Sequence, residues 1–483
     1  LKTAEGKNQA LSLIEKADVV IENFRPNVMK RLGLDYASVK KVNPGLVYLS
    51  LPGFASTDKE RAHIQAWEGV LGAAAGVYGM ANHTRENLKF PPVYSWVPQC
   101  SMYGGYNGAL AVMAALVARE TYNQGTVIEV PLADVGLLGF LIHFELDFLY
   151  LPLSDHLKSC AYALEDSEAT QLSKLEKAHM DHWSDPYGSI YSCQDGRKIF
   201  IYACYPNVSR YSRRLLKALG IDEQLKREGF VNAGVEEKGL DNNLSDIYGL
   251  SAKHKQRLRQ VMDEKILTKT ALQWEELLAK ANIAVTLIRT REEWLALEPM
   301  LRSGIFTRMD DGKSAITVPG RITDMSGPAG ASMDVYREAK PTTFAEVNDL
   351  LNADAARRRR ERWVWDNTTP MKKGDLLRGL KVLVLANMLA GPFAGVFLAA
   401  YGANVVKADP PHCPSMLLDG KRSILTDIKT KPGHEVFCRL VSWADVVTHN
   451  ILDDTAKRMG ATHADLREIN RDVVSCQVSA FGG

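Results

Sequence analysis

The chain has 483 residues, of which 46% are hydrophobic and 24% are charged, a composition typical of a globular protein with core enough for two or three domains. Its formal net charge of +2 excludes a generally basic nucleic-acid binder and leaves room for a local anion pocket. The seven cysteines are scattered singly without a CxxC pair, which favours a reducing cytoplasm over a disulfide framework or a zinc site. No apolar run reaches the length of about 18 residues that is needed to cross a membrane.

Strands and helices alternate through the first 150 residues. Helical apolar spacing over Gly6–Lys16 leads into a strand at Asp18–Ile21, and a second strand at Leu46–Leu51 ends at a Pro-Gly pair. A buried helix is expected over Gly108–Glu120, followed by a strand at Thr126–Val130. We interpret residues 1–180 as a large α/β domain with a parallel sheet.

The chain changes character after Asp155. Two apolar stretches, Tyr187–Cys193 and Lys198–Cys204, flank a Gln-Asp-Gly turn and predict a β-hairpin, and amphipathic helices follow it. We therefore expect a smaller α+β domain over residues 181–325 and a linker over residues 326–375.

A βαβ unit is predicted near the end of the chain. Leu380–Leu385 has the length and composition of a strand, a Gly-Pro pair follows it, Phe393–Tyr401 has helical apolar spacing, and a second strand ends at Asp409. Because a parallel strand pair requires such a crossover helix, this unit predicts the start of a second large, Rossmann-like α/β domain over residues 376–483.

An internal repeat links the two ends of the chain. At a constant offset of 427 residues, sixteen of the fifty-six residues from Leu1 to Ser56 are identical to residues 428–483 without a gap. The identical pairs include Asn23/Asn450 and Arg31/Arg458. We interpret the chain as a tandem of two homologous units. The first unit would lack its opening βαβ segment and the second would continue beyond residue 483, so we expect a fragment of a longer protein.

Together these motifs resemble those of the family III CoA-transferases, the group of the formyl-CoA and carnitine CoA-transferases. The resemblance rests on four segments in the family's order, namely residues 17–54 (ADVVIENFRP onward), 125–134 (GTVIEVPLAD), 382–411 (VLVLANMLAGPFAG onward) and 420–430 (GKRSILTDIKT). The doubled arrangement is most similar to tandem members of the family that attach CoA to dimethylsulfoniopropionate (DMSP) and release dimethyl sulfide.

The resemblance implies a nucleophilic aspartate at Asp134, which follows a strand and lies at the start of a helix expected over Pro131–Phe144. A carboxylate with an ordinary pKa of about 3.9 is ionised at neutral pH, and the positive end of the helix dipole favours that charge. Its attack on an acyl-CoA would give a mixed anhydride. The resemblance also implies that Glu68 lies near the nucleophile, where it is a candidate base for removing a proton α to the thioester.

The coenzyme A contacts of the family match seven positions here. They are Asn23, Phe24 and Arg31 in the first unit and Leu389, Lys429, Asn450 and Arg458 in the second. Arg31 suits a phosphate because a guanidinium donates several hydrogen bonds. A lysine that the family often has before the glutamate is Gln65 here, and the second unit has Ile451 in place of Phe24.

The resemblance implies transfer of CoA between an acyl-CoA and a small carboxylic acid, in a cytoplasmic enzyme that uses no metal, nucleic acid or membrane. Its units would pair in a homodimer or within one chain. A sulfonium substrate such as DMSP would need an aromatic cage. The aromatic residues available for a cage are Trp67, Tyr94, Trp96, Tyr103 and Tyr106.

Two other interpretations stay open. The βαβ unit would suit a dinucleotide-binding oxidoreductase with Asp409 on a ribose, although Gly391 and Gly395 do not have the GxGxxG spacing. Alternatively, the first unit is a non-catalytic scaffold that completes a paired structure around an active second unit. In that case Asp134 is an ordinary residue at the start of a helix.

Overall fold

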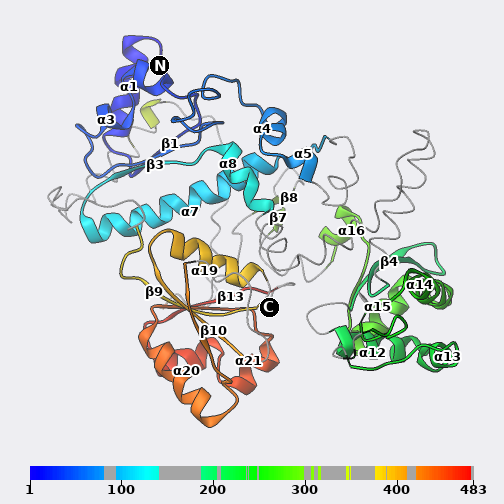
Figure 1. Cartoon of the computed structure of the whole chain (residues 1–483). Helices are drawn as coiled ribbons and strands as arrows, with labels where there is room; N and C mark the ends of the chain where they lie inside the picture. The colour runs from blue at the N-terminus through cyan, green and yellow to red at the C-terminus, as the bar shows by residue number, and fades with distance from the viewer. Residues whose placement is uncertain are drawn as a thin grey trace. The chain divides into compact units, whose positions relative to one another are not determined.

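The structure is a computed structural model (Figure 1). It describes residues 1–80, 94–140, 186–203, 208–234, 237, 239–246, 250–297, 306–308, 314–316, 344–346, 349, 376–387, 389–410 and 420–479. The chain forms two compact units, one of Leu1–Ser154 with Glu338–Gly483 and one of Asp155–Arg337. The domain boundaries expected from the sequence stay predictions, and most of the expected linker lies outside the described residues.

A parallel three-stranded sheet forms near the start of the chain. Its strands, in the order β1-β2-β3, are Val19–Glu22, Val47–Ser50 and Thr126–Glu129. The helices of this region are α1 (Ala4–Ile14), α2 (Val28–Leu32), α3 (Tyr36–Val39), α4 (Glu68–Ala74), α5 (Val77–Met80) and α7 (Gln99–Tyr122). On one face of β2, Val47 packs in a cluster with Ala111 of α7, and on the other Tyr48 packs with Ile14 of α1. The strand is therefore covered on both faces, as parallel strands usually are.

A five-stranded parallel sheet forms at the end of the chain, in the order β11-β10-β9-β12-β13. Its strands are β9 (Lys381–Leu385), β10 (Asn404–Asp409), β11 (Arg422–Leu425), β12 (Val446–His449) and β13 (Val474–Gln477), and its helices are α19 (Ala390–Ala400), α20 (Lys431–Trp443), α21 (Asp453–Met459) and α22 (His463–Ile469). Counted along the chain this order is 3-2-1-4-5, which is the order of a Rossmann sheet. The predicted α/β class is confirmed.

Helices cover the five-stranded sheet on both faces (Figure 1). Phe437 of α20 packs in one cluster with Leu383 and Val447. The opposite face carries a second cluster that contains Val384 together with Ala114 of α7. Because alternate residues of β9 point to opposite faces, its run of apolar residues is buried on both sides.

The two sheets repeat one strand pairing. β1 and β2 pair in the register Val19↔Val47, and β12 and β13 pair in the register Val446↔Val474. Each residue of the second pair lies 427 positions after its counterpart, which is the offset of the sequence repeat. This shared pairing agrees with the second homologous unit predicted from the sequence, whose bounds stay a prediction.

Side-chain contacts repeat at the same offset. The amide of Asn43 donates to two carbonyls at the end of α1, at 2.9 and 2.8 Å, and the amide of Asn470 donates to two carbonyls at the end of α20, at 3.3 and 2.8 Å. Gly33 ends α2 with a φ of 67°, and Gly460 ends α21 with a φ of 64°. Both glycines therefore adopt the left-handed conformation that favours this residue at helix ends.

The other compact unit contains an antiparallel sheet in the order β4-β5-β6. The strands and helices of this compact unit are β4 (Gly188–Ser192), β5 (Lys198–Tyr202), α12 (Val208–Leu219), α13 (Asp222–Arg227), α14 (Ala252–Ile266), α15 (Ala271–Lys280), β6 (Ala284–Leu287), α16 (Arg291–Leu295), β7 (Phe306–Arg308) and β8 (Ser314–Ile316). The predicted hairpin is β4–β5, and Gly196 in its turn has a φ of 75°. Strand β6 and helix α13 were not predicted.

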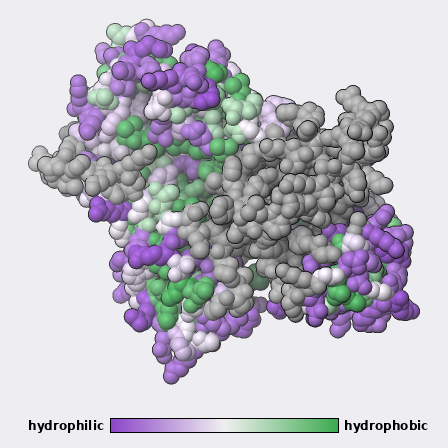
Figure 2. Space-filling view, viewed as in Figure 1, coloured by the Kyte–Doolittle hydropathy of each residue, from purple (hydrophilic) through white to green (hydrophobic). Residues whose placement is uncertain are grey.

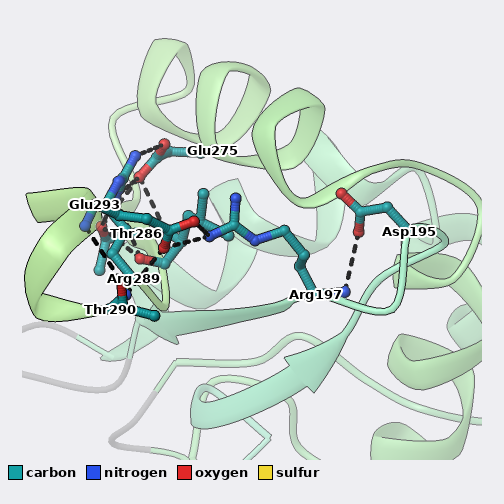
Figure 3. A network of polar contacts seen from close by, with 8 residues as sticks. Asp195, Arg197, Glu275, Thr286, Arg289, Thr290 and Glu293 are labelled. Carbon is teal, nitrogen blue, oxygen red and sulfur yellow. Dashed lines mark hydrogen bonds and ion pairs between the residues drawn. The ribbon is translucent and has the colours of Figure 1, made fainter. Parts of the chain in front are cut away.

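A network of hydrogen bonds and ion pairs connects β6 to α15 (Figure 3). Arg289 donates to the two carboxylate oxygens of Glu275 at 2.9 and 2.6 Å, and the backbone amide of Leu287 donates to the same carboxylate at 2.9 Å. Burial alone would raise the pKa of Glu275, but these hydrogen bonds hold it below its ordinary value. Arg197, next to the hairpin turn, also pairs with Glu293 of α16 at 2.8 Å. The network explains how a strand of four residues keeps its register.

The surface of the described residues gives no sign of a membrane span or a metal centre. None of their helices is long and apolar enough to cross a bilayer, and they contain no cluster of three His, Cys, Asp or Glu side chains suited to a metal ion. Figure 2 shows hydrophilic side chains over much of the visible described surface, with hydrophobic patches between them. The expected absence of metal and membrane partners stays a prediction.

Candidate active site

Asp134 lies in the helix that directly follows β3. This helix, α8 (Leu132–Gly136), is shorter than predicted, because a 3₁₀ turn, η1 (Leu137–Phe140), replaces it after Gly136. The continuation expected beyond residue 140 lies outside the described residues. The first two amides of α8 donate to the carbonyls of Pro52 and Gly53, which holds its start against the segment after β2.

The Asp134 carboxylate is exposed and surrounded by other charges. No described residue donates a hydrogen bond to it. Partial burial, together with the charges of Asp58 and Glu129, raises its pKa, and the charge of Arg61 lowers it. Arg61 Nε donates to Asp58 at 2.6 Å, and Glu129 accepts from the Ser56 amide at 2.9 Å. An accessible carboxylate of this kind can attack a carbonyl carbon without a partner base.

Glu68 begins α4, and its carboxylate caps the N-terminus of α7. It accepts from the backbone amides of Cys100 and Ser101 at 2.9 and 3.0 Å, and from the Ser101 hydroxyl. Helix α7 in turn lies against α8, since a Cβ added to Gly136 would be 2.6 Å from the sulfur of Cys100. Both carboxylate oxygens of Glu68 already accept hydrogen bonds. The arrangement therefore suits a residue that positions α4 and α7 better than it suits a free base.

The first anion pocket is a cleft of about 510 Å³ beside α2. Arg25, Arg31, Lys59 and His63 line it, together with Asp58. The pocket therefore contains Arg31, one of the predicted coenzyme A residues, among three fixed cations. Two other predicted residues of this unit, at positions 23 and 24, are exposed on the loop after β1 and do not line the cleft.

The second anion pocket is a cleft of about 460 Å³ at the N-terminus of α20. It is lined by Lys429, Lys431, His434 and Arg458, so the structure brings the predicted residues Lys429 and Arg458 together. Thr430 caps this helix by accepting from its Gly433 amide at 3.2 Å. Cations gathered at the N-terminus of a helix form a favourable environment for a phosphate.

Asn450 and Leu389 lie apart from that pocket, where β12 and β9 end. The Asn450 side chain accepts from the backbone amide of Asn387 at 3.0 Å and donates to its carbonyl at 2.8 Å. Leu389 occupies the N-cap position of α19. Strands β9 and β12 flank the point where the strand order reverses, which is where ligands commonly bind in open α/β sheets. The four predicted residues of the second unit thus fall into two groups.

The aromatic residues considered for a cage do not gather into one in the described part of the chain. Trp67, Tyr94, Trp96 and Tyr106 are 76%, 70%, 83% and 63% exposed, and the described rings of the five candidates do not pair with one another. Tyr94 instead packs on Tyr78, with ring centroids 5.4 Å apart. The cage stays a prediction.

The sequence of the chain matches a family model described as CoA-transferase family III over residues 1–147, 155–343 and 377–483. These segments include both anion pockets and Asp134. The chain belongs to CoA-transferase family III. The resemblance seen in its motifs is therefore confirmed.

Several family III proteins are similar to this chain. It is 30% identical to the CoA-transferase/lyase DddD of Marinomonas sp. (strain MWYL1) over 504 aligned positions, which cover the whole chain and 59% of that protein. It is 38% identical over 134 residues to the acetyl-CoA:oxalate CoA-transferase of Acetobacter aceti, covering 28% of this chain and 33% of the relative. A crystal structure of a CAIB/BAIF family protein from Brucella suis superimposes with a TM-score of 0.48 at 20% identity, over 73% of this chain and 79% of that one. The chain thus spans about three fifths of the length of DddD.

Sequence reasoning missed the charges that the fold adds to these family III positions. Arg25 and Lys59 join Arg31 in the first pocket, and the Asp58–Arg61 pair lies beside Asp134. Residues 58–61 form a short polar stretch with alternating charges, which is usually a solvated loop. Only the fold, which places this segment next to the end of β3, brings it near Asp134.

Proposed function

We propose that this chain takes part in the transfer of CoA between an acyl-CoA and a small carboxylic acid, with Asp134 as the nucleophile. The observation that supports this most directly is the exposed, unbonded carboxylate of Asp134 beside a loop that also lines a cationic pocket. Membership of family III supports the class of reaction.

The chemistry requires a carboxylate that alternates between free and acylated states. An Asp134 oxygen attacks the acyl carbon, the C–S bond breaks, and CoA leaves as the thiolate while a mixed anhydride forms. The thiolate then attacks the aspartyl carbonyl, which releases the first acid and gives an aspartyl thioester. A second acid attacks that thioester, expels CoA thiolate and forms a new anhydride. The thiolate then attacks the acyl carbon of the second acid in this anhydride, which forms the new acyl-CoA and frees Asp134.

The two anion pockets are the candidate sites for the phosphate groups of coenzyme A. Arg31, Arg25 and Lys59 serve in the first unit, and Arg458, Lys429 and Lys431 serve in the second. Guanidinium and ammonium groups hold phosphate oxygens through charge-assisted hydrogen bonds. The predicted residues Asn23, Phe24, Leu389 and Asn450 contact other parts of the coenzyme in this proposal.

The similarity to a CoA-transferase/lyase favours DMSP as the acid and adds a cleavage step. In that step a base removes the proton α to the thioester carbonyl, the bond from the β-carbon to sulfur breaks, and dimethyl sulfide leaves an acryloyl thioester. Glu68 would have to release the N-terminus of α7 to act as that base. We therefore assign Glu68 a positioning role and leave the base unassigned.

An NAD-dependent oxidoreductase receives no support from the site. Asp409, the residue that would hold a ribose, is 2% exposed, and its carboxylate accepts from Lys407 Nζ at 2.5 Å. The scaffold interpretation of the first unit stays the second candidate.

The test is to replace Asp134 by Asn in the complete protein and to measure transfer from acetyl-CoA to DMSP and to oxalate. Loss of the nucleophile should reduce kcat by about 10³-fold or more. Asp222→Asn, a first-turn aspartate of α13 in the other compact unit, is the matched control and should stay within about twofold of wild type. Transfer at the wild-type rate in Asp134→Asn would establish the scaffold interpretation.

A further inference from the structure

Two side chains hold the backbone directly after β9. Lys407, which is fully buried, donates through Nζ to the carbonyl of Ala386 at 2.6 Å. Asn450 accepts from the backbone amide of Asn387 at 3.0 Å and donates to its carbonyl at 2.8 Å. The backbone that leads to Leu389 is therefore fixed at its start, at the point where the strand order reverses.

Helix α19 packs directly on β9 because two of its residues are glycines. A Cβ added to Gly391 would overlap the Cβ of Ala386, and one added to Gly395 would lie 2.8 Å from a methyl carbon of Val384. Protein interiors are too closely packed to absorb such overlaps without movement of the backbone. The first turns of α19 therefore lie in contact with the strand.

Lys421 crosses α19 at Gly395 and reaches the first turn of the helix. Its Cδ lies 3.4 Å from the position of a Cβ on Gly395, and its Nζ donates to the carbonyl of Pro392 at 2.8 Å. A Cβ on the preceding residue, Gly420, would lie 3.0 Å from the Cβ of Ala399. The chain therefore approaches α19 at Gly420, and the lysine extends from there along the helix toward its N-terminus.

The ammonium group of Lys421 lies at the end of α19 where the helix dipole disfavours a cation. The N-terminus of a helix carries the positive end of the dipole, so cations stabilise a helix near its C-terminus instead. The dipole therefore does not account for a lysine at this position. What the side chain contributes is the hydrogen bond that holds the Pro392 carbonyl.

We propose that Lys421 is a positioning residue for coenzyme A, because its hydrogen bond to Pro392 fixes the first turn of α19, and Leu389 before it, in the form that binds the coenzyme. The inference rests on the part of the proposed function that assigns coenzyme contacts to Leu389 and Asn450, and it does not depend on which residue is the nucleophile. The first amides of a helix have no acceptor within the helix, so this turn offers donors to a ligand. A turn that is already ordered loses less entropy when the ligand binds.

The test is to measure the dissociation constant of coenzyme A for the complete protein by isothermal titration calorimetry. Lys421→Met keeps the length of the side chain but removes the donor, and should raise Kd by about 10-fold. Lys421→Arg keeps a charged donor and should recover most of this loss. Arg422→Met is the matched control, because this neighbouring side chain donates to Asn404 instead, and its Kd should stay within about twofold of wild type.

Hydrogen exchange separates positioning from the other roles that Lys421 could have. In wild type, coenzyme A should slow the exchange of amides in residues 389–396. In free Lys421→Met these amides should exchange faster, while those of β12 and β13 stay unchanged. A raised Kd without faster exchange would mean that the lysine contacts the coenzyme directly. Faster exchange with an unchanged Kd, or throughout the sheet, would mean a merely structural role. Each of these results would overturn the inference.

Failure of the inference and failure of the proposed function give different results. If wild type binds coenzyme A and Lys421→Met binds it equally tightly, the inference fails and the proposed function stands. If wild type binds coenzyme A without protecting residues 389–396, the contact assigned to Leu389 is wrong and the inference fails with it. If wild type does not bind coenzyme A, both the inference and the proposed function fail.

Discussion

The two equivalent segments at the start and the end of the chain pair their strands in the same register but have different charges around one arginine position. Before α2 the first unit has Arg25-Pro26-Asn27, and the second has Leu452-Asp453-Asp454 at the equivalent positions. Arg31 lines a pocket with Arg25, whereas Arg458 lines a pocket with Lys431 of α20. The backbone fixes the position of the arginine, and the charges of the residues around it determine where an anion would bind.

A second difference concerns the aspartate before each equivalent strand. Asp18 pairs with Arg119 of α7 at 3.1 Å, whereas Asp445 accepts from the backbone amide of Lys381 in β9 at 2.8 Å. In the described residues β1 is at the edge of its sheet, and β12 lies between β9 and β13. An aspartate at the same position can therefore bond either to a neighbouring strand or to a helix that covers the sheet.

The largest effect is expected from the buried ion pair in β10, a strand without a described counterpart in the first unit. Lys407 and Asp409 are almost fully buried and lie 2.5 Å apart. Lys407→Met removes the ammonium from a buried carboxylate and should reduce the free energy of unfolding by about 3–5 kcal/mol. The double variant Lys407→Met/Asp409→Leu should recover most of that loss, as measured by urea denaturation. Equal stability of the single variant and wild type would contradict the assignment.

A smaller and symmetric effect is expected from the two equivalent asparagines. Asn43→Ala and Asn470→Ala each remove the side-chain donor of two carbonyls at the end of a helix, and one carbonyl of each pair still accepts from a backbone amide. Each substitution should cost about 1–3 kcal/mol in unfolding free energy. Hydrogen exchange should locate the first loss in α1 and β2 and the second in α20 and β13. A cost at only one of the two sites would break the structural equivalence of the units.

The smallest effect is expected at the end of β1 and β12, where Glu22 corresponds to His449. His449 is 4% exposed, and burial lowers its pKa although Asp453 opposes the shift. Because the unfolded chain then binds more protons, stability should fall as the pH drops below about 6.5. His449→Gln should flatten this slope between pH 5 and 7, and Glu22→Gln should not. An unchanged slope in His449→Gln would reject the assignment.

Much of the fold could be predicted because its strongest signals are local. A Gly-Pro pair follows the apolar run of β9 and lies in the first turn of α19, and the repeat relates α20 and β12 to their equivalents in the first unit. Strand β6 and helix α13 were not predicted, and the six residues of α13 are too few to establish a helical period. The helix after Pro131 was predicted too long, since periodicity does not reveal the change to a 3₁₀ turn.

The site could be predicted only in part. The motif resemblance identified Asp134, and the arginines of the repeat led to both pockets. Arg61 and Lys59 could not be identified, because their relation to Asp134 depends on a contact between Ser56 and Glu129, which are 73 residues apart. Charged loop residues have no period of their own, so their role depends on tertiary structure.

The close contact between Cys100 and Gly136 gives the molecule an internal probe. The thiol is fully buried, and burial together with Glu68 raises its pKa to about 11. A thiol reagent can therefore react only when α7 and α8 separate and the sulfur reaches water. The rate of alkylation of this cysteine would report how often α8 detaches from α7, in a protein that needs no added label and no substrate.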